Sequence, residues 1–369
     1  MDLALRISIA MALIGLVSGY VMYRSDFCLA GMVRDHILFG EKRLLRALAL
    51  TVLLSAPVFE GLRLFGLAPF SFFDPPSLNS LLGGVLFGFG MVLSGACIAG
   101  TFWKLGSGQG LQFATIFGLL AGSALYAETA PFFRELAKTT RFFAAPTLPE
   151  LLGVNPFYII TPLLIGGTAL LWGWSKRGLW KHKNFARGYV EPWKAGIVIA
   201  LLGAASIAIT GIPLSAATLF AKAAGFAESV FLPGHFAEVP FFKPSLVMEL
   251  PVQGGTLNWG NGPVWDSAAA IQLPFLLFMV VGGFAGARSA GDFEWHFRVP
   301  PVQYLSALLG GASMAIGSRV AGGCNVWQLL GGLPFFSISS FIFFIGLYPG
   351  AFLGVRILTG KVLSRKAGG

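Results

Sequence analysis

The sequence predicts an all-α integral membrane protein, a polytopic helix bundle of about nine transmembrane helices joined to short re-entrant helices. Hydrophobic residues make up 55% of its 369 positions and charged residues only 11%, which leaves too little polar surface to solvate a globule of this size. The 49 glycines suit membrane helices, where they allow close backbone approach and broken helices that line cavities. A membrane barrel is disfavoured, because its strands show as alternating segments of ~10 residues and not as long apolar runs.

Nine apolar runs of membrane-spanning length follow one another along the chain. They are Leu3 to Met22, Leu44 to Phe65, Leu81 to Ile98, Leu111 to Tyr126, Phe157 to Trp174, Ala195 to Thr210, Ala268 to Ala287, Val302 to Ile316 and Phe335 to Leu353. The first run lacks a basic leader and a small-residue cleavage site, so we expect it to be retained as a span. We expect a single integral membrane domain over residues 1–369.

Loop cations predict the orientation, because cytoplasmic loops of membrane proteins are enriched in Lys and Arg. Such cations gather in the first loop, in a middle loop and in the tail: Arg24, Arg34, Lys42, Arg43, Arg46; Lys176, Arg177, Lys181, Lys183, Arg187, Lys194; Arg356, Lys361, Arg365, Lys366. Nine spans with the N-terminus outside and the C-terminus in the cytoplasm of a bacterial inner membrane satisfy these positions. The same loops explain the excess of 26 basic over 16 acidic residues without a nucleic-acid partner.

The stretch from Gly211 to Ser267 is expected on the outside, because Lys222 and Lys243 are its only lysines or arginines. It is rich in proline and aromatic residues. We expect it to contain a short re-entrant or surface helix and not to form a separate domain.

An internal repeat organises the chain. A shift of 227 residues places one set of glycines and a cysteine on another, and a shift of 228 continues the match: Gly83, Gly84, Gly90, Gly95 and Cys97 on Gly310, Gly311, Gly317, Gly322 and Cys324; Gly118 and Gly122 on Gly346 and Gly350. The third span should run inward and the eighth outward, so the halves, roughly 1–175 and 190–369, should be inverted. Inverted repeats recur in transporters, with the solute site between them near the midplane. The alternative is that the glycines only mark tight helix contacts.

Three cysteines in small-residue settings are the candidate chemical groups. They stand at Ser25-Asp26-Phe27-Cys28, at Ser94-Gly95-Ala96-Cys97 with Gly100 close behind, and at Gly322-Gly323-Cys324-Asn325. Their odd number and wide spacing predict no disulfide framework, and the absence of a neighbouring histidine or acid at Cys97 and Cys324 predicts no metal site. A lone buried cysteine is ordinarily a small packing residue. Equivalent positions in an inverted repeat instead suggest that Cys97 and Cys324 face each other across a solute.

A thiol is a weak donor and a polarizable acceptor, which suits a solute that presents sulfur. Broken helices add backbone N–H groups and positive helix ends that hold an anion. Arg319 and Lys104 are expected to attract anions toward the pore. Glu60 lies inside the second span, where we expect it to pair with Arg63 or Arg319 or to carry a proton.

The segment from Gly88 to Thr101 resembles the first signature of the YeeE/YedE family of bacterial membrane proteins. The segment from Gly317 to Leu330 resembles the second signature, and Ser25-Asp26-Phe27-Cys28 resembles the N-terminal cysteine segment of that family. The resemblance implies thiosulfate uptake by an hourglass-shaped monomer whose short helices dip to a central constriction. It implies that Cys28, Cys97 and Cys324 pass the anion along by transient S–H hydrogen bonds. A TusA-type or rhodanese-type sulfur carrier in the cytoplasm is an implied partner.

Other functions remain open at this stage. A selenium compound could take the place of thiosulfate, and the 220–265 insert exceeds what we expect of the core family fold. A membrane thiol oxidoreductase or sulfurtransferase would need a reactive thiolate near a cation, and only Cys28 has such neighbours, in Arg24 and Arg34. A scaffold subunit would use its cysteines for packing alone. We expect no enzyme activity and no cofactor, and the sequence has no nucleotide-binding loop for ATP drive.

Overall fold

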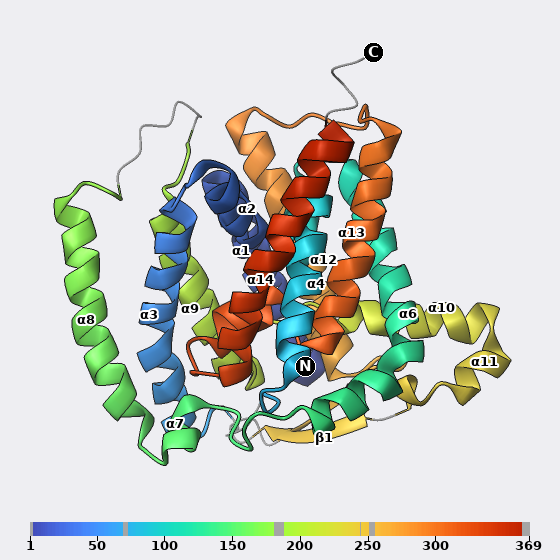
Figure 1. Ribbon diagram of the computed structural model, residues 1–369, viewed down its shortest axis with the longest axis horizontal. Helices are drawn as coiled ribbons and strands as arrows, with labels where there is room; N and C mark the ends of the chain where they lie inside the picture. The colour runs from blue at the N-terminus through green and yellow to red at the C-terminus, as the bar shows by residue number, and fades with distance from the viewer. Residues whose placement is uncertain (1–2, 69–72, 181–187, 244, 251–254, 364–369) are drawn as a thin grey trace.

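The computed structural model describes residues 3–68, 73–180, 188–243, 245–250 and 255–363 (Figure 1). The long elements are α1 (Leu3–Ser25), α2 (Leu29–Phe39), α3 (Arg43–Leu64), α4 (Leu78–Ser94), α5 (Ile98–Gly106), α6 (Leu111–Thr139), α8 (Pro156–Lys176), α9 (Pro192–Thr210), α10 (Thr218–Phe231), α12 (Ser267–Ala290), α13 (Pro301–Val320) and α14 (Ile338–Ile357). The short ones are α7 (Leu148–Leu152), α11 (Pro233–Glu238), the 3-10 turn η1 (Pro240–Phe242), an antiparallel hairpin of β1 (Ser245–Leu250) and β2 (Gly255–Gly260), and the π-helical turns η2 (Val326–Gly332) and η3 (Leu358–Leu363). The predicted all-α class is confirmed.

Eight helical segments of the described chain are long and apolar enough to cross a membrane. They are Ala4–Phe39, Arg43–Leu64, Leu78–Gly106, Leu111–Thr139, Pro156–Lys176, Pro192–Thr210, Ser267–Ala290 and Ile338–Gly360. The other predicted span, Val302 to Ile316, is α13, which is not among these eight. It packs between α4 and α6 and runs the height of the bundle (Figure 1), so its polar residues are shielded by other helices. The start of α1 and the end of α14 lie toward opposite ends of the bundle (Figure 1).

Three helices break where the sequence suggested a continuous run or a loop. The predicted span from Leu81 to Ile98 is not one helix, because Gly95 adopts a left-handed φ of 71° and ends α4 before α5 begins. Gly322, its partner in the repeat, has a φ of 74° between α13 and η2. Asp26 is left-handed as well, with a φ of 49°, between α1 and the unpredicted α2. Each of the three breaks contains one cysteine.

Helices α4 and α13 cross at glycines. A Cβ on Gly83 would lie 2.6 Å from the carbonyl oxygen of Gly317, and a Cβ on Gly310 would lie 2.6 Å from the carbonyl oxygen of Gly90. A side chain has no room at either place, which explains the glycines. Because 83 faces 317 and 90 faces 310, the helices run antiparallel, and the 227-residue shift exchanges the two contacts. Larger contacts pair in the same way: α4 packs on α14 as α13 packs on α6, and α1 packs on α12 as α9 packs on α3.

The stretch from Gly211 to Ser267 holds the expected short helix, α10, together with α11, η1 and the unpredicted hairpin. These elements lie toward the end of the bundle opposite the end of α14, which we call the hairpin end (Figure 1). Lys222 of α10 is buried, and its Nζ donates to the Asp266 carboxylate at 2.7 Å. Lys222 therefore ties α10 to the start of α12 and is not a solvated loop cation.

Glu60 is buried in α3 and pairs with Arg63, whose Nε lies 2.7 Å from the Glu60 carboxylate. Of the two partners considered from the sequence, Arg63 is thus the one in contact. Five of the cations used to predict orientation, Lys181, Lys183, Arg187, Arg365 and Lys366, lie outside the described residues.

Candidate functional site

Each cysteine sits at the start of a short helix. Cys28 and Cys97 are the N-cap residues of α2 and α5, and Cys324 directly precedes the first turn of η2. All three are buried and free. Their sulfur atoms lie against backbone N–H groups of the following turn, with Gly100 N–H donating to Cys97 Sγ at 3.2 Å; the others are Ala30 and Gly31 at Cys28, and Val326, Trp327 and also Ala216 at Cys324. Such helix starts carry partial positive charge and favour a bound anion.

The Cys28 and Cys97 thiols lie next to each other. Gly100 lies against both, since a Cβ there would be 3.2 Å from Cys97 Sγ and 3.5 Å from Cys28 Sγ. The absence of a side chain at Gly100 therefore leaves both sulfur atoms uncovered on that side. Sequence reasoning missed this pair, because nothing in the chain links the α1–α2 break to the α4–α5 break.

Asn325 completes this group, which we call the thiol cluster: Cys28, Cys97, Gly100 and Asn325. Its side chain is fully buried and lies next to the Cys97 thiol. Apart from the Cys97 thiol, which is a weak hydrogen-bonding group, neither its Oδ1 nor its Nδ2 has a hydrogen-bond partner among the described residues. An amide buried in this way is costly unless something binds to it.

Cys324 lines a cavity of about 490 Å³ at the hairpin end. A second cavity of about 280 Å³ adjoins it, and the two share Asp74, Pro75, Arg319 and Gly322. We call the two cavities together the vestibule. The second cavity is lined by three further cations: Arg134, Lys138 and Arg141. With Arg319 between the two cavities, the vestibule carries four cations against the single carboxylate of Asp74.

Arg319 is held toward the vestibule by the Gly211–Ser267 stretch. Its guanidinium donates to the Ala217 carbonyl oxygen at 2.6 Å and to Asn261 Oδ1 at 3.3 Å. Both glycines before Cys324 are open to the first cavity. A Cβ on Gly323 would lie 2.3 Å from the Trp327 ring, so only glycine fits at position 323 without movement of that ring.

On the other side of the thiol cluster, cations again lie near a cysteine. Lys104 Nζ donates to the Gly95 carbonyl oxygen at 2.7 Å, and its charge acts on Cys28 and on Asp26. Arg34 and Gly95 line a cavity of about 180 Å³ there. Cationic groups therefore stand at both ends of the line from Cys324 to Cys28.

The structure brings together most of the residues singled out from the sequence. Cys28, Cys97, Gly100 and Asn325 form the thiol cluster, while Cys324, Gly322, Gly323 and Arg319 line the vestibule and Gly95 caps α4. The sulfur in contact with Cys97 is that of Cys28, so the opposition of Cys97 and Cys324 stays a prediction. Sequence reasoning missed Asp74 and the three cations of the second cavity, because none of them lies in a cysteine segment. Arg134 and Lys138 belong to α6, Arg141 follows α6, and Asp74 lies between α3 and α4.

Most of the chain is similar to known membrane transport proteins. The profile described as sulphur transport matches residues 24–353, which takes in all three helix breaks. A thiosulfate transporter, TsuA, of Spirochaeta thermophila is 27% identical over 355 residues, covering 90% of this chain and 94% of that protein. The protein of the same name from Escherichia coli is 25% identical over 333 residues, covering 85% and 83%. A probable transporter, YedE, of Salmonella typhimurium is 29% identical over 188 residues, covering 50% and 44%. The chain therefore belongs to the sulphur transport family, the YeeE/YedE family that its cysteine segments resemble.

Proposed function

We propose that this protein carries thiosulfate, or a sulfur anion of the same kind, inward across the bacterial inner membrane. The anion enters the vestibule, is met by Cys324, passes to the thiol cluster and leaves past Lys104 and Arg34. Family membership, two relatives named thiosulfate transporters and the cations at both ends of the line support this route. On this proposal the hairpin end and the N-terminus face outward and the C-terminus faces the cytoplasm.

Asn325 is the observation that carries the proposal. A buried polar group without a partner costs roughly 1–3 kcal/mol, and the Asn325 amide has no partner among the described residues other than the weak Cys97 thiol. A bound anion would offset this cost by accepting a hydrogen bond from the amide. Thiosulfate presents both oxygen and sulfur, so the Asn325 amide can donate to an oxygen while the Cys97 thiol donates to the terminal sulfur.

The cysteines act in this proposal as thiols throughout. Cys324 holds the anion at the vestibule with help from the backbone N–H groups around it, and Cys97 and Cys28 receive it at the thiol cluster. The inverted halves, roughly 1–175 and 190–369, place these steps between the two copies, as their exchanged helix contacts support. The protein works as a monomer, and a sulfur carrier of the TusA or rhodanese type takes up the product in the cytoplasm.

The contact between the Cys28 and Cys97 thiols favours one second candidate, a membrane thiol oxidoreductase or sulfurtransferase. Such a protein would form a disulfide or a persulfide at these sulfurs during turnover. Mass spectrometry of the cysteine peptides during transport distinguishes the two functions, because the transporter leaves all three cysteines as free thiols.

The test is uptake of sulfur-labelled thiosulfate into proteoliposomes. We expect Cys97→Ala, Cys324→Ala and Asn325→Leu to lose about tenfold or more, since a hydrogen bond to a charged partner is worth roughly 1.5–3 kcal/mol. Thr168→Ala on the exposed face of α8 is the matched control and should transport like the parent. Undiminished uptake by both cysteine variants would overturn the relay, and failure of the parent to take up thiosulfate would overturn the substrate. Selenite added as a competitor tests the selenium alternative.

A further inference from the structure

We propose that Asp74 controls the access of anions to Cys324 by binding a proton. A divalent anion reaches Cys324 when the Asp74 carboxyl group is neutral and is repelled when that carboxyl group is ionised. The inference rests on the proposed transport function and adds the ion on which that transport depends. It is carried by the position of a single carboxylate among the cations of the vestibule.

Asp74 stands where the two cavities of the vestibule join. It lies in the connection between α3 and α4 and lines both cavities. Its Oδ2 is 2.7 Å from the place that a Cβ on Gly322 would occupy. The carboxylate therefore covers the backbone that leads through Gly323 to Cys324, and an anion moving from the second cavity to Cys324 must pass it.

The charged and titratable groups around Asp74 come from every element that lines this part of the vestibule. Arg134 and Lys138 of α6 and Arg141 just after it line the second cavity, and Arg319 of α13 lines both cavities. Tyr126 of α6 faces the same space. Arg141 attracts Asp74 through charge alone, and Arg319 is bonded to Ala217 and Asn261. The cations draw an anion in, and Asp74 is the one acidic side chain among the residues lining the two cavities.

Burial raises the pKa of Asp74, and the charge of Arg141 opposes this only in part. The Asp74 side chain is exposed to the cavities, yet surrounding protein removes enough water for desolvation to be the largest influence on its pKa. A raised pKa means that the carboxyl group takes up its proton at a higher pH than an ordinary aspartate. The neutral fraction of Asp74 therefore grows as the pH falls and vanishes as the pH rises through this pKa.

The consequence for transport has a definite sign. Thiosulfate stays a dianion over the physiological pH range, so only the charge of the protein changes. Two negative charges beside one ionised carboxylate at contact distance repel each other enough to lower occupancy by at least about tenfold, even with the screening of water. Uptake should therefore rise as the pH of the vestibule falls, and the dianion should pass Asp74 while its carboxyl group is protonated.

The experiment compares uptake of labelled thiosulfate by the parent, Asp74→Asn and Glu150→Gln in proteoliposomes at equal internal and external pH between about 5 and 8. Glu150→Gln is the matched control, because Glu150 of α7 lies outside the residues lining both cavities. We expect uptake by the parent and the control to rise about tenfold from the top to the bottom of this range. Uptake by Asp74→Asn should be flat and, at the top of the range, about tenfold faster than uptake by the parent.

A second variant tests the electrostatics independently. Arg141→Gln removes the cation that lowers the pKa of Asp74, so its pH profile should move to higher pH. An Asp74→Asn protein that keeps the parent's pH profile overturns the inference, and so does one that elutes as a homogeneous monomer yet transports at no pH. Both results leave the proposed function standing if the parent transports. A parent without uptake at every pH defeats the proposed function, and this inference fails with it.

Discussion

At the scale of single residues, the site depends on a missing side chain at Gly100 and on a buried amide at Asn325. Gly100 has no side chain beside two sulfur atoms, and the Asn325 amide has no partner among the described residues other than the weak Cys97 thiol. Both features cost stability, because glycine is a poor helix former and an unpaired buried amide loses its solvation. An anion bound between these residues would fill the space beside Gly100 and accept a hydrogen bond from the Asn325 amide.

Gly100→Ala should separate folding from transport. Alanine is a better helix former than glycine by about 1 kcal/mol, so α5 should not be weakened by the backbone change. The added Cβ would nevertheless lie 3.2 Å from Cys97 Sγ and 3.5 Å from Cys28 Sγ. We expect thiosulfate uptake to fall about tenfold or more while the protein still elutes as a homogeneous species.

Gly166→Ala on α8 is the control, because a Cβ at Gly166 meets no atom within 4 Å. It should leave uptake at the parent level. Normal transport by Gly100→Ala would show that the substrate does not approach the two sulfurs from the side of α5.

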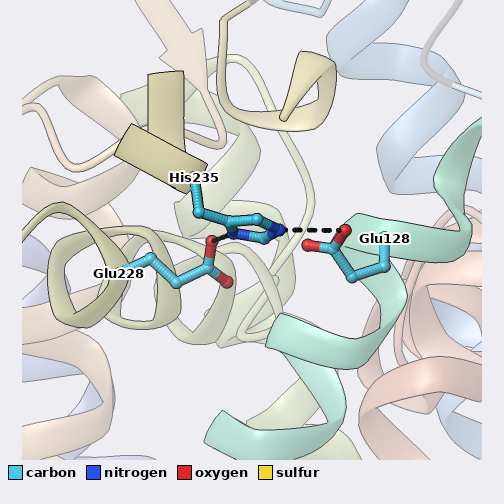
Figure 2. A group of neighbouring side chains, drawn as sticks. All are labelled: Glu128, Glu228 and His235. Atoms are coloured by element: carbon cyan, nitrogen blue, oxygen red, sulfur yellow. Dashed lines mark ion pairs between the residues drawn. The ribbon is translucent and has the colours of Figure 1, made fainter. Parts of the chain in front are cut away.

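At the scale of elements, α10 and α11 are joined to α6 by an imidazole between two carboxylates (Figure 2). His235 Nε2 lies 3.5 Å from Glu128 Oε2, and His235 Nδ1 lies 3.6 Å from Glu228 Oε2. Each ring nitrogen faces a different carboxylate, and one ligand atom from each of the three side chains lies within 4.8 Å of the others. The imidazole therefore connects α11 both to α6 and to α10.

Glu228→Gln should stabilise the protein at neutral pH. Burial raises the pKa of Glu228, the charge of Glu128 raises it further, and His235 lowers it in part. An acid whose pKa is higher in the folded state contributes stability at low pH and loses that contribution as the pH rises through the folded pKa. Near pH 7 the substitution should therefore raise the melting temperature by roughly one to two degrees, with little effect near pH 4.

Thermal unfolding in detergent at the two pH values measures this effect. Glu135→Gln, an exposed residue of α6 in a surface ion pair with Lys138, should change neither value. A lower melting temperature for Glu228→Gln at neutral pH would mean that attraction to His235 outweighs burial and the repulsion from Glu128.

The elements also show what the sequence could predict and what it could not. Apolar runs locate spans because lipid demands them, but they do not locate ends. The predicted Leu111 to Tyr126 span continues to Thr139, and this extension carries Arg134 and Lys138 to the vestibule. Glycines marked the segments of Cys97 and Cys324, but the sequence predicted Leu81 to Ile98 as one span, so the break at Gly95 was not predicted. The Cys28–Cys97 contact, the hairpin and the position of Asp74 between the two cavities depend on packing between distant segments, which no local pattern encodes.

At the scale of the whole molecule, two crossed copies of one helical unit account for the position of the site. The α4–α13 contact is symmetric, because Gly83 meets Gly317 as Gly310 meets Gly90. The breaks after these two helices place Cys97 and Cys324 at the starts of α5 and η2, and α1 and α2 add Cys28. Backbone-to-backbone packing of this kind leaves little freedom for the helices to slide. A fixed pathway with small local motions fits it better than a large rearrangement.

The number and direction of crossings can be tested by labelling. Nine crossings with the N-terminus outside place the end of α6 outside and the connection between α12 and α13 inside. Thr139→Cys and Glu294→Cys put exposed thiols at these two places, while the three native cysteines are buried and serve as the unlabelled background in the parent. In intact cells a membrane-impermeant maleimide should label Thr139→Cys strongly and Glu294→Cys only after permeabilisation. The reverse pattern would overturn the orientation, and equal labelling of both in intact cells would overturn the odd number of crossings, since α6 and α12 would then no longer end on opposite sides.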